Sequence, residues 1–300
     1  MQYVKGLYNY ADTRKSAVTF GKFDGLHKGH QKLVENVKKQ SEKENISSVV
    51  CAFDMRAKEL LMTKEERKEC LAQEVDYLID CAFTKEFREI EAEDFIRDII
   101  AGVFHAAYVV VGTDFRFGYG KRGDIHMLKA CEVQYGYELI VIEKERYGGQ
   151  IISSTYVKEV LKEGKMNLAG RLLGYPYCVS GIVEHGKQLG RTLGFPTLNV
   201  VWPEQKIVPP RGVYLCRVFM EGRAYNGIAN IGIKPTVSDE KKVRIESFLF
   251  GYGGDAYGKE IRIELLEYVR PEQRFPDKEA LKSCVQKDIE RGKKYFGIGE

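Results

Sequence analysis

The sequence has no cysteine pair at the CxxC spacing, although it contains seven cysteines in 300 residues. They stand apart at positions 51, 70, 81, 131, 178, 216 and 284. A scattered, odd number of cysteines argues against a disulfide framework and against a zinc site. It is typical of reduced thiols, so we expect a cytoplasmic protein.

Long apolar runs are also missing. The longest candidates, such as residues 106–111, have the length of a strand, so no transmembrane segment is expected. Residues 1–15 lack the apolar stretch and cleavage site of a secretory signal. The net charge of +4 is small, which argues against a dedicated nucleic-acid binder. We therefore expect neither a membrane nor a nucleic acid as a partner.

The common nucleotide-binding motifs are absent or misplaced. No GxxxxGK[ST] sequence occurs, so a P-loop cannot hold a nucleotide here. A literal GxGxxG stands at Gly118, Gly120 and Gly123. It begins several residues after the preceding apolar run, and Lys121 and Arg122 interrupt the tight turn that a dinucleotide fingerprint needs. Any nucleotide must be held by other means.

The apolar content of 44% suffices for two domains with separate cores. Up to about residue 173, apolar strand-like runs alternate with helical patterns, which predicts a Rossmann-like, doubly wound parallel sheet. The expected strands are residues 17–20, 49–53, 77–83, 108–111 and 138–142, and the expected helices include those starting after Thr63 and spanning 91–103 and 125–135.

The alternation of strand and helix patterns ends near residue 175. From there to residue 269 the chain shows β-rich runs with Gly and Pro turns, followed by an apolar stripe over residues 277–294. The β-rich runs are 178–183, 212–220, 224–231, 243–250 and 260–269. This pattern predicts a small antiparallel β-barrel with a C-terminal helix. We expect domains at residues 1–174 and 175–300.

The stretch AVTFGKFDGLHKGH at residues 17–30 combines a strand, a turn and a helix start. His27 and His30 lie at the start of that helix. Unpaired backbone N–H groups and the helix dipole make such a place an anion site, and two imidazoles can donate to the same phosphate. From the spacing alone, the pair could equally be a cap, a metal-ligand pair or a pair without a role.

A second informative stretch is the Gly-rich, basic segment of residues 186–199. Its glycines permit close approach of the backbone to phosphates, and Lys187 and Arg191 can offset their charge. The oxygens of Thr197 and Asn199 suit Mg²⁺, which is a hard cation. Taken by itself, a Gly-rich basic loop is more often a solvated hairpin, just as a carboxylate such as Glu246 in the run 243–250 usually faces water.

The sequences of these stretches resemble motifs of the bifunctional bacterial riboflavin kinase/FAD synthetases, and the resemblance covers nearly the whole chain. GKFDGLHKGH is similar to the HxGH signature of nucleotidyltransferases, and GTDFRFG and ISSTYVK are similar to two further segments of that domain. HGKQLGRTLGFPTLN and VRIESF are similar to riboflavin kinase motifs. The resemblance implies phosphorylation of riboflavin to FMN by the second domain and adenylylation of FMN to FAD, with release of pyrophosphate, by the first.

The resemblance also implies site residues. The implied catalytic residues are His27, His30, Lys158 and Glu246. The implied nucleotide-binding residues are Gly21, Phe23, Asp24, Gly29, Gly112, Asp114, Ser154, Thr155, Gly186, Lys187, Gly190, Arg191, Thr197 and Asn199. Arg116, Phe117 and Arg270 are the implied flavin-binding residues, and Thr197 and Asn199 the implied Mg²⁺ ligands. ATP is then the co-substrate of both steps.

Three departures from the family pattern keep alternatives open. Lys22 replaces the commoner Asn, Lys158 replaces Arg, and residues 54–58 replace a Pro-His-Pro-like segment. One alternative is a riboflavin kinase with a degenerate first domain. Another is a flavin- or nucleotide-binding regulator without turnover. A different nucleotidyltransferase would explain the first domain but not the barrel.

Overall fold

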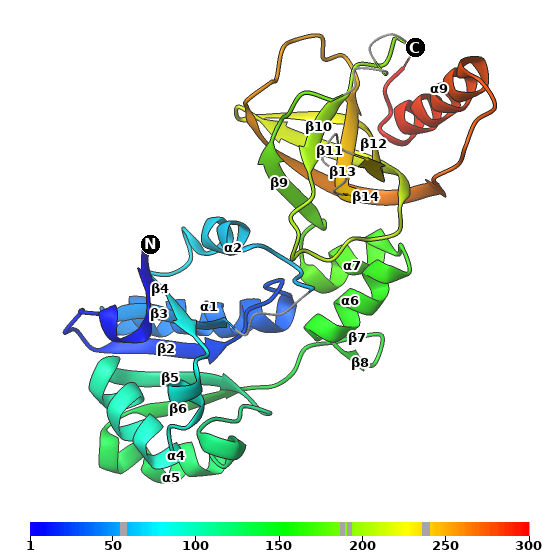
Figure 1. Ribbon diagram of the computed structural model, residues 1–300. Coiled ribbons are helices and arrows are strands. Elements are labelled where there is room, and N and C mark those ends of the chain that lie inside the picture. The colour runs from blue at the N-terminus through cyan, green and yellow to red at the C-terminus, as the bar shows by residue number, and fades with distance from the viewer. Residues whose placement is uncertain (55–58, 187–189, 191–193, 236–240, 300) are drawn as a thin grey trace. The chain divides into compact units, whose positions relative to one another are not determined.

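The computed structural model describes residues 1–54, 59–186, 190, 194–235 and 241–299. The chain forms two compact units, Met1–Ser154 and Thr155–Glu300 (Figure 1). Each unit has its own sheet and its own core, so each is described by itself.

The first unit is built on a six-stranded sheet in the order β1-β4-β3-β2-β5-β6, with every neighbouring pair parallel. The strands are β1 (Gln2–Lys5), β2 (Ser16–Gly21), β3 (Ser47–Asp54), β4 (Tyr77–Ala82), β5 (Ala106–Gly112) and β6 (Glu138–Ile142). Their near-continuous apolar runs fit burial on both faces. The predicted doubly wound sheet is confirmed, and β1 is an edge strand that the sequence analysis missed.

Helices cover both faces of this sheet (Figure 1). Val34 and Val37 of α1 pack on one face, while Ile96 and Leu128 belong to the core on the other. The helical segments are α1 (Lys28–Glu44), α2 (Lys64–Leu71), α3 (Lys85–Arg88), α4 (Ala92–Asp94), η2 (Phe95–Val103), α5 (Ile125–Tyr135) and the short 3₁₀ turns η1 (Leu7–Asn9) and η3 (Tyr119–Lys121). The capping box predicted at Thr63 is present, because Thr63 and Glu66 bond reciprocally.

The helix predicted over residues 91–103 has an unexpected form. Phe95, Ile96, Ile99 and Ile100 are all buried, as their spacing predicts, but Phe95–Val103 is a π-helix. The apolar spacing indicates which side of a helix is buried. It does not determine whether the backbone closes its turns on the fourth or the fifth residue.

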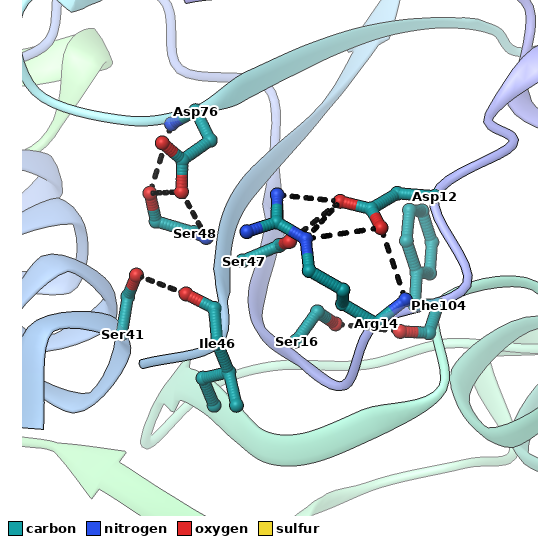
Figure 2. Close-up of polar contacts among 9 residues, drawn as sticks. All are labelled: Asp12, Arg14, Ser16, Ser41, Ile46, Ser47, Ser48, Asp76 and Phe104. Carbon is teal, nitrogen blue, oxygen red and sulfur yellow. Dashed lines mark hydrogen bonds and ion pairs between the residues drawn. The ribbon is translucent and has the colours of Figure 1, made fainter. Parts of the chain in front are cut away.

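Polar contacts connect residues at the amino ends of β2, β3 and β4 (Figure 2). Asp12 accepts hydrogen bonds from the Ser47 hydroxyl at 2.6 Å and from Arg14. Ser48 and Asp76 exchange hydrogen bonds between the starts of β3 and β4. These contacts join the starts of β3 and β4 to each other and to the segment before β2.

The second unit is an antiparallel sheet in the order β10-β13-β12-β11-β14-β9. Its strands are β9 (Cys178–Ile182), β10 (Leu198–Val201), β11 (Gly212–Met220), β12 (Arg223–Pro235), β13 (Lys241–Leu249) and β14 (Glu260–Pro271). A bridge between Glu184 and Asn199 joins the two ends of this order, so the sheet is nearly a closed barrel. The barrel prediction is confirmed, although β10 was missed.

Among the residues that the structure describes, the helices with defined bounds that belong mainly to the second unit are three. They are α6 (Ser154–Lys162), α7 (Met166–Leu173) and α9 (Lys278–Tyr295). α9 starts at the predicted place because the Asp277 side chain accepts a hydrogen bond from the Ala280 N–H. The remaining strands, β7 (Arg146–Tyr147) and β8 (Gln150–Ile151), form a small hairpin in the first unit.

Candidate active sites

The order of the strands locates the first site. β2 lies between β3 and β5, so the strand order changes direction beside β2. Parallel sheets bind ligands beyond the carboxyl ends of their strands at such a switch point. The loops that follow β2 and β5 carry most of the residues predicted for the first domain, including His27 and Asp114.

His27 and His30 form a stacked pair at the start of α1. Their ring centroids are 3.8 Å apart with an interplanar angle of 19°. His27 is the N-cap residue, and its carbonyl accepts the N–H groups of His30 and Gln31. Gly29 permits this stacking, since a Cβ there would lie 3.3 Å from the His27 ring. The Nδ1 atoms of both rings are buried and have no hydrogen-bond partner among the described residues.

Both imidazoles are neutral at ordinary pH. Burial lowers the pKa of His27 to about 4, although the nearby Asp24 partly opposes this. Burial, and then the neighbouring His27, hold the pKa of His30 well below its usual value. A neutral imidazole still donates one N–H hydrogen bond. The pair can therefore offer hydrogen bonds to an anion, but not the charge of two cations.

The loop before the histidines is held rigidly. Phe23 is fully buried with a φ of 47°, and Gly25 has a φ of 82° against Leu61. The Asp24 carboxylate accepts the Leu61 N–H at 2.7 Å, and the Asp24 carbonyl accepts the Ser154 hydroxyl at 2.9 Å. Asp24 is thus engaged in fixing the loop. Gly21 lies at the end of β2, where a Cβ would crowd the Phe23 ring.

Ser154 brings the start of α6 to this loop through its bond to Asp24. Thr155 and Lys158 follow on α6 and belong to the second compact unit. Thr155 is exposed and Lys158 is half-buried. Their predicted roles toward a phosphate remain predictions.

The loop after β5 holds the other predicted residues of this unit. Gly112 ends the strand, and Asp114 forms an ion pair with Lys144 at 2.7 Å. Arg116 is exposed. Phe117 is only 6% exposed and packs on Phe95, so it offers little surface to a flavin.

An aromatic cluster at this edge of the sheet was missed. Phe53, Phe83 and Phe87 are half-buried with ring centroids 5.5–5.8 Å apart, and Phe115 stacks on Phe20. A signal was available, because Phe53 and Phe83 each lie at or just beyond the end of an expected strand. Half-buried rings of this kind can stack on a planar ligand.

The second site is a row of three polar side chains across the barrel. Asn199 of β10 is paired with Glu246 of β13, and Glu246 is paired with Asn230 of β12. Directly opposite residues have Cβ atoms about 5 Å apart. The barrel thus gathers the predicted Asn199 and Glu246, together with Asn230, which was not predicted as a site residue.

Two hollows meet at this row. One, of about 290 Å³, is lined by Glu246, Asn230, Arg270 and apolar side chains that include Phe248. The other, of about 320 Å³, is lined by Gly186 and by residues 252–257. Thr197 and Asn199 line both. This arrangement lets a group pass from a ligand in one hollow to a ligand in the other.

Glycines shape the loop beside the two hollows. A Cβ at Gly186 would lie 2.7 Å from Asn199 Nδ2, and one at Gly190 would lie 2.4 Å from the Phe195 carbonyl oxygen. Neither position accepts a side chain without movement. The predicted cations Lys187 and Arg191 lie outside the described residues.

His185, Tyr257 and Asp288 lie at or beside the hollows and were not predicted as site residues. His185 stacks on Tyr257 at 3.8 Å, beside the hollow that Gly186 lines. Arg270, predicted to bind flavin, lines the apolar hollow and is bonded to Asp288 of α9. These partners lie far apart in the sequence, so no local pattern could reveal them.

The comparisons with known proteins agree for both units. The family model for FAD synthetase matches residues 9–156, and the one for riboflavin kinase matches residues 173–296. A bifunctional riboflavin kinase/FMN adenylyltransferase of Escherichia coli K12 is 34% identical over 311 residues, with 99% of each chain covered. One from Buchnera aphidicola subsp. Schizaphis graminum is 36% identical over 313 residues, covering 99% of this chain and 100% of that protein.

A solved structure covers nearly the whole chain as well. A crystal structure from Streptococcus pneumoniae, named as a macrolide-efflux protein, has a TM-score of 0.87 and 28% identity, and it covers 97% of this chain and 98% of its own. Among the residues described here, no helix has the length and apolarity needed to cross a membrane. Together, the doubly wound unit, the barrel and the relatives that match over their full length show that this chain belongs to the family of bifunctional riboflavin kinase/FMN adenylyltransferases.

Proposed function

We propose that the chain makes FAD from riboflavin in two steps that each consume ATP, one in each domain. The observation that carries this proposal is the presence of two separate groups of polar side chains, the stacked histidines and the Asn199–Glu246–Asn230 row. The adenylyltransferase domain spans residues 1–174 and the kinase domain residues 175–300. Seven free cysteines support a cytoplasmic location.

In the kinase step, riboflavin occupies the apolar hollow and ATP the hollow beside Gly186. The ribityl 5′-hydroxyl attacks the γ-phosphorus, the bond to the leaving ADP oxygen breaks, and Glu246 accepts the hydroxyl proton. The support is the position of Glu246 beside Asn199, which lines both hollows. Positioning and charge stabilisation then supply most of the catalysis.

Mg²⁺ fits the same place. The Thr197 hydroxyl and the Asn199 amide offer two oxygen donors where the hollows meet, and Asn199 Nδ2 is turned toward the Thr197 carbonyl at 3.2 Å. Mg²⁺ is usually held by few protein oxygens together with phosphates and water. When bound, the ion offsets the charge of the phosphate groups. Thr197 and Asn199 orient it and hold the ATP chain.

In the adenylylation step, a phosphate oxygen of FMN attacks the α-phosphorus of a second ATP, and pyrophosphate leaves. The nucleophile is already ionised, so no strong base is needed. His27 and His30, kept neutral by burial, donate hydrogen bonds to the charge that develops around phosphorus. Ser154, which is bonded to the Asp24 carbonyl, assists in the same unit, while Asp24 keeps the loop in place. Thr155 and Lys158 keep the phosphate-binding roles that the resemblance implies.

The aromatic cluster suggests where the flavin of FMN rests in the first domain. Phe53, Phe83, Phe87 and Phe115 present half-buried rings at the carboxyl edge of the sheet. We infer that the isoalloxazine ring stacks there, with Arg116 at the edge and Phe117 supporting Phe115 from below. This modifies the role expected for Phe117, which becomes a supporting residue.

Chromatography of the products tests the proposal. The purified chain is incubated with riboflavin, ATP and Mg²⁺, and riboflavin, FMN and FAD are separated over time. We expect FMN to appear first and FAD to accumulate. FMN without FAD would favour a kinase with a degenerate first domain, and neither product would favour a binding protein. The full-length match to bifunctional enzymes favours FAD.

A further inference from the structure

The C-terminal helix contributes a wall to the apolar hollow of the barrel. Leu281, Val285 and Asp288 of α9 all line it. Their spacing of four and three residues places them on one face of the helix. Leu281 and Val285 are the apolar part of that face. Asp288 is its charged end and is only 6% exposed as a residue.

The Asp288 carboxylate accepts several hydrogen bonds from the Arg270 guanidinium. Arg270 Nε lies 3.1 Å from both carboxylate oxygens of Asp288, and Nη2 lies 2.6 Å from Oδ2. Arg270 is at the end of β14, while Asp288 lies 18 residues later on α9. A two-pronged contact of this kind fixes the plane of the guanidinium as well as its position.

The remaining contacts leave part of the guanidinium for a ligand. Nη1 donates to the Pro271 carbonyl at 3.2 Å, and the ring of Phe275 lies 6.0 Å from the guanidinium carbon. Arginine has five N–H donors, and these contacts use three of them. Two N–H groups therefore have no partner among the described residues, and Arg270 and Phe275 both line the hollow.

We propose that Asp288 is a positioning residue for riboflavin, because it holds Arg270 in the orientation in which its remaining N–H groups donate to the flavin. The inference rests on the proposed kinase function of this hollow. It makes α9 part of the substrate site and not only a cover of the barrel. Asp288 itself touches no reacting atom, so its effect passes through Arg270.

The test is steady-state kinetics of FMN formation with D288N, which keeps the shape but removes the charge. We expect KM for riboflavin to rise about tenfold, the size that follows from loss of one charge-assisted hydrogen bond. We expect kcat and KM for ATP to stay within about twofold, because Glu246, Thr197 and Asn199 are untouched. The matched control is E290Q, because Glu290 is an exposed carboxylate on the same helix. This variant should behave as wild type.

Two further variants distinguish positioning from a merely structural role. R270Q alone should raise KM for riboflavin at least as much as D288N. The double variant should have the same KM as R270Q alone, because both changes act through the same contact. D288E retains the carboxylate and should recover most of the change, which also covers the case in which D288N fails to fold.

An unchanged KM in D288N would overturn the proposal, as would additive effects in the double variant or a D288E variant no better than D288N. A wild-type chain that makes no FMN would instead refute the proposed kinase function. The two failures are thus separated by the wild-type measurement.

Discussion

At the residue scale, the two proposed reactions make different demands on the protein. In the proposed kinase step the attacking hydroxyl must lose its proton, and Glu246 is the carboxylate that would accept it. In the proposed adenylylation step the nucleophile is already charged, so the two imidazoles, whose pKa values burial lowers, would instead stabilise the charge that develops around phosphorus. Changes at these residues should therefore separate the two activities within one chain.

We expect Glu246→Gln to reduce FMN formation by at least about 100-fold, because removing a general base costs two to four orders of magnitude. Conversion of added FMN to FAD should continue at the wild-type rate. Both rates are measured by chromatography. Glu260→Gln, an exposed carboxylate on β14, is the control. Equal loss of both activities in Glu246→Gln would contradict the assignment of two sites.

The double change of His27 and His30 to Ala should have the reverse effect. Each donor lost at a developing charge costs about 100-fold or more, so FAD formation from FMN should disappear while FMN formation persists. His126→Ala removes an exposed histidine of the same unit and should leave both rates unchanged. Persistent FAD output from the double variant would remove the proposed role of the pair.

The same histidines make stability depend on pH. The pKa of His27 falls from 6.5 to about 4 on folding, so between these values the unfolded state binds the extra proton. The free energy of unfolding of the first unit should therefore decrease as pH falls from about 6.5 to 4, by roughly 3 kcal/mol for His27.

Urea unfolding at a series of pH values, followed by a probe in the first unit, measures this decrease. His27→Gln should reduce the pH dependence without removing it, because glutamine does not titrate but the buried His30 still does. A wild-type chain whose free energy of unfolding is the same at pH 7 and pH 5 would show that the imidazoles are not desolvated in the folded state.

At the scale of elements, the first site depends on the loop between β2 and α1. Gly25 adopts a left-handed φ of 82°, and a Cβ there would lie 2.6 Å from Leu61 Cδ1. Asp24 and Leu61 are bonded at the same place. The loop is therefore both packed and hydrogen-bonded against Leu61.

We expect Gly25→Ala to abolish FAD formation and to leave FMN formation intact. The control is Gly136→Ala, which has a similar φ of 71° at the end of α5 but nothing within 4 Å of the added methyl group. Both variants carry left-handed strain of about 1–2 kcal/mol, and only Gly25→Ala adds the clash. Similar FAD rates in the two variants would show that the packing of this loop does not matter.

Many of the helices and strands, and part of each candidate site, could be predicted because they depend on residues that are close together in the sequence. The strand, the turn and the histidines at residues 17–30 are consecutive, and the barrel strands have clear apolar patterns. What could not be predicted depends on contacts between distant segments. The register that sets Asn230 beside Glu246 and the pairing of Arg270 with Asp288 are of this kind.

Short strands and unusual helices could not be predicted from the local pattern of apolar residues either. β10 has only four residues and follows a Gly-rich stretch of the sequence, so its alternation is too brief to detect. Yet it carries Asn199. The π-helical form of Phe95–Val103 was equally invisible, because the buried positions fit an α-helix as well.

At the scale of the whole molecule, the central claim is that each of two unrelated folds binds its own ATP. The first cleaves ATP at the α-phosphorus and the second at the γ-phosphorus. FMN is the product of one and the substrate of the other. The two steps in one chain thus require two nucleotide sites, whatever the distance between them.

Isothermal titration calorimetry measures the number of these sites directly. The ligand is an ATP analogue whose α,β and β,γ bridging oxygens are methylene groups, with Mg²⁺ and flavin supplied, so that neither bond can break. The account predicts two binding sites per wild-type chain. A single site in the wild-type chain would contradict it.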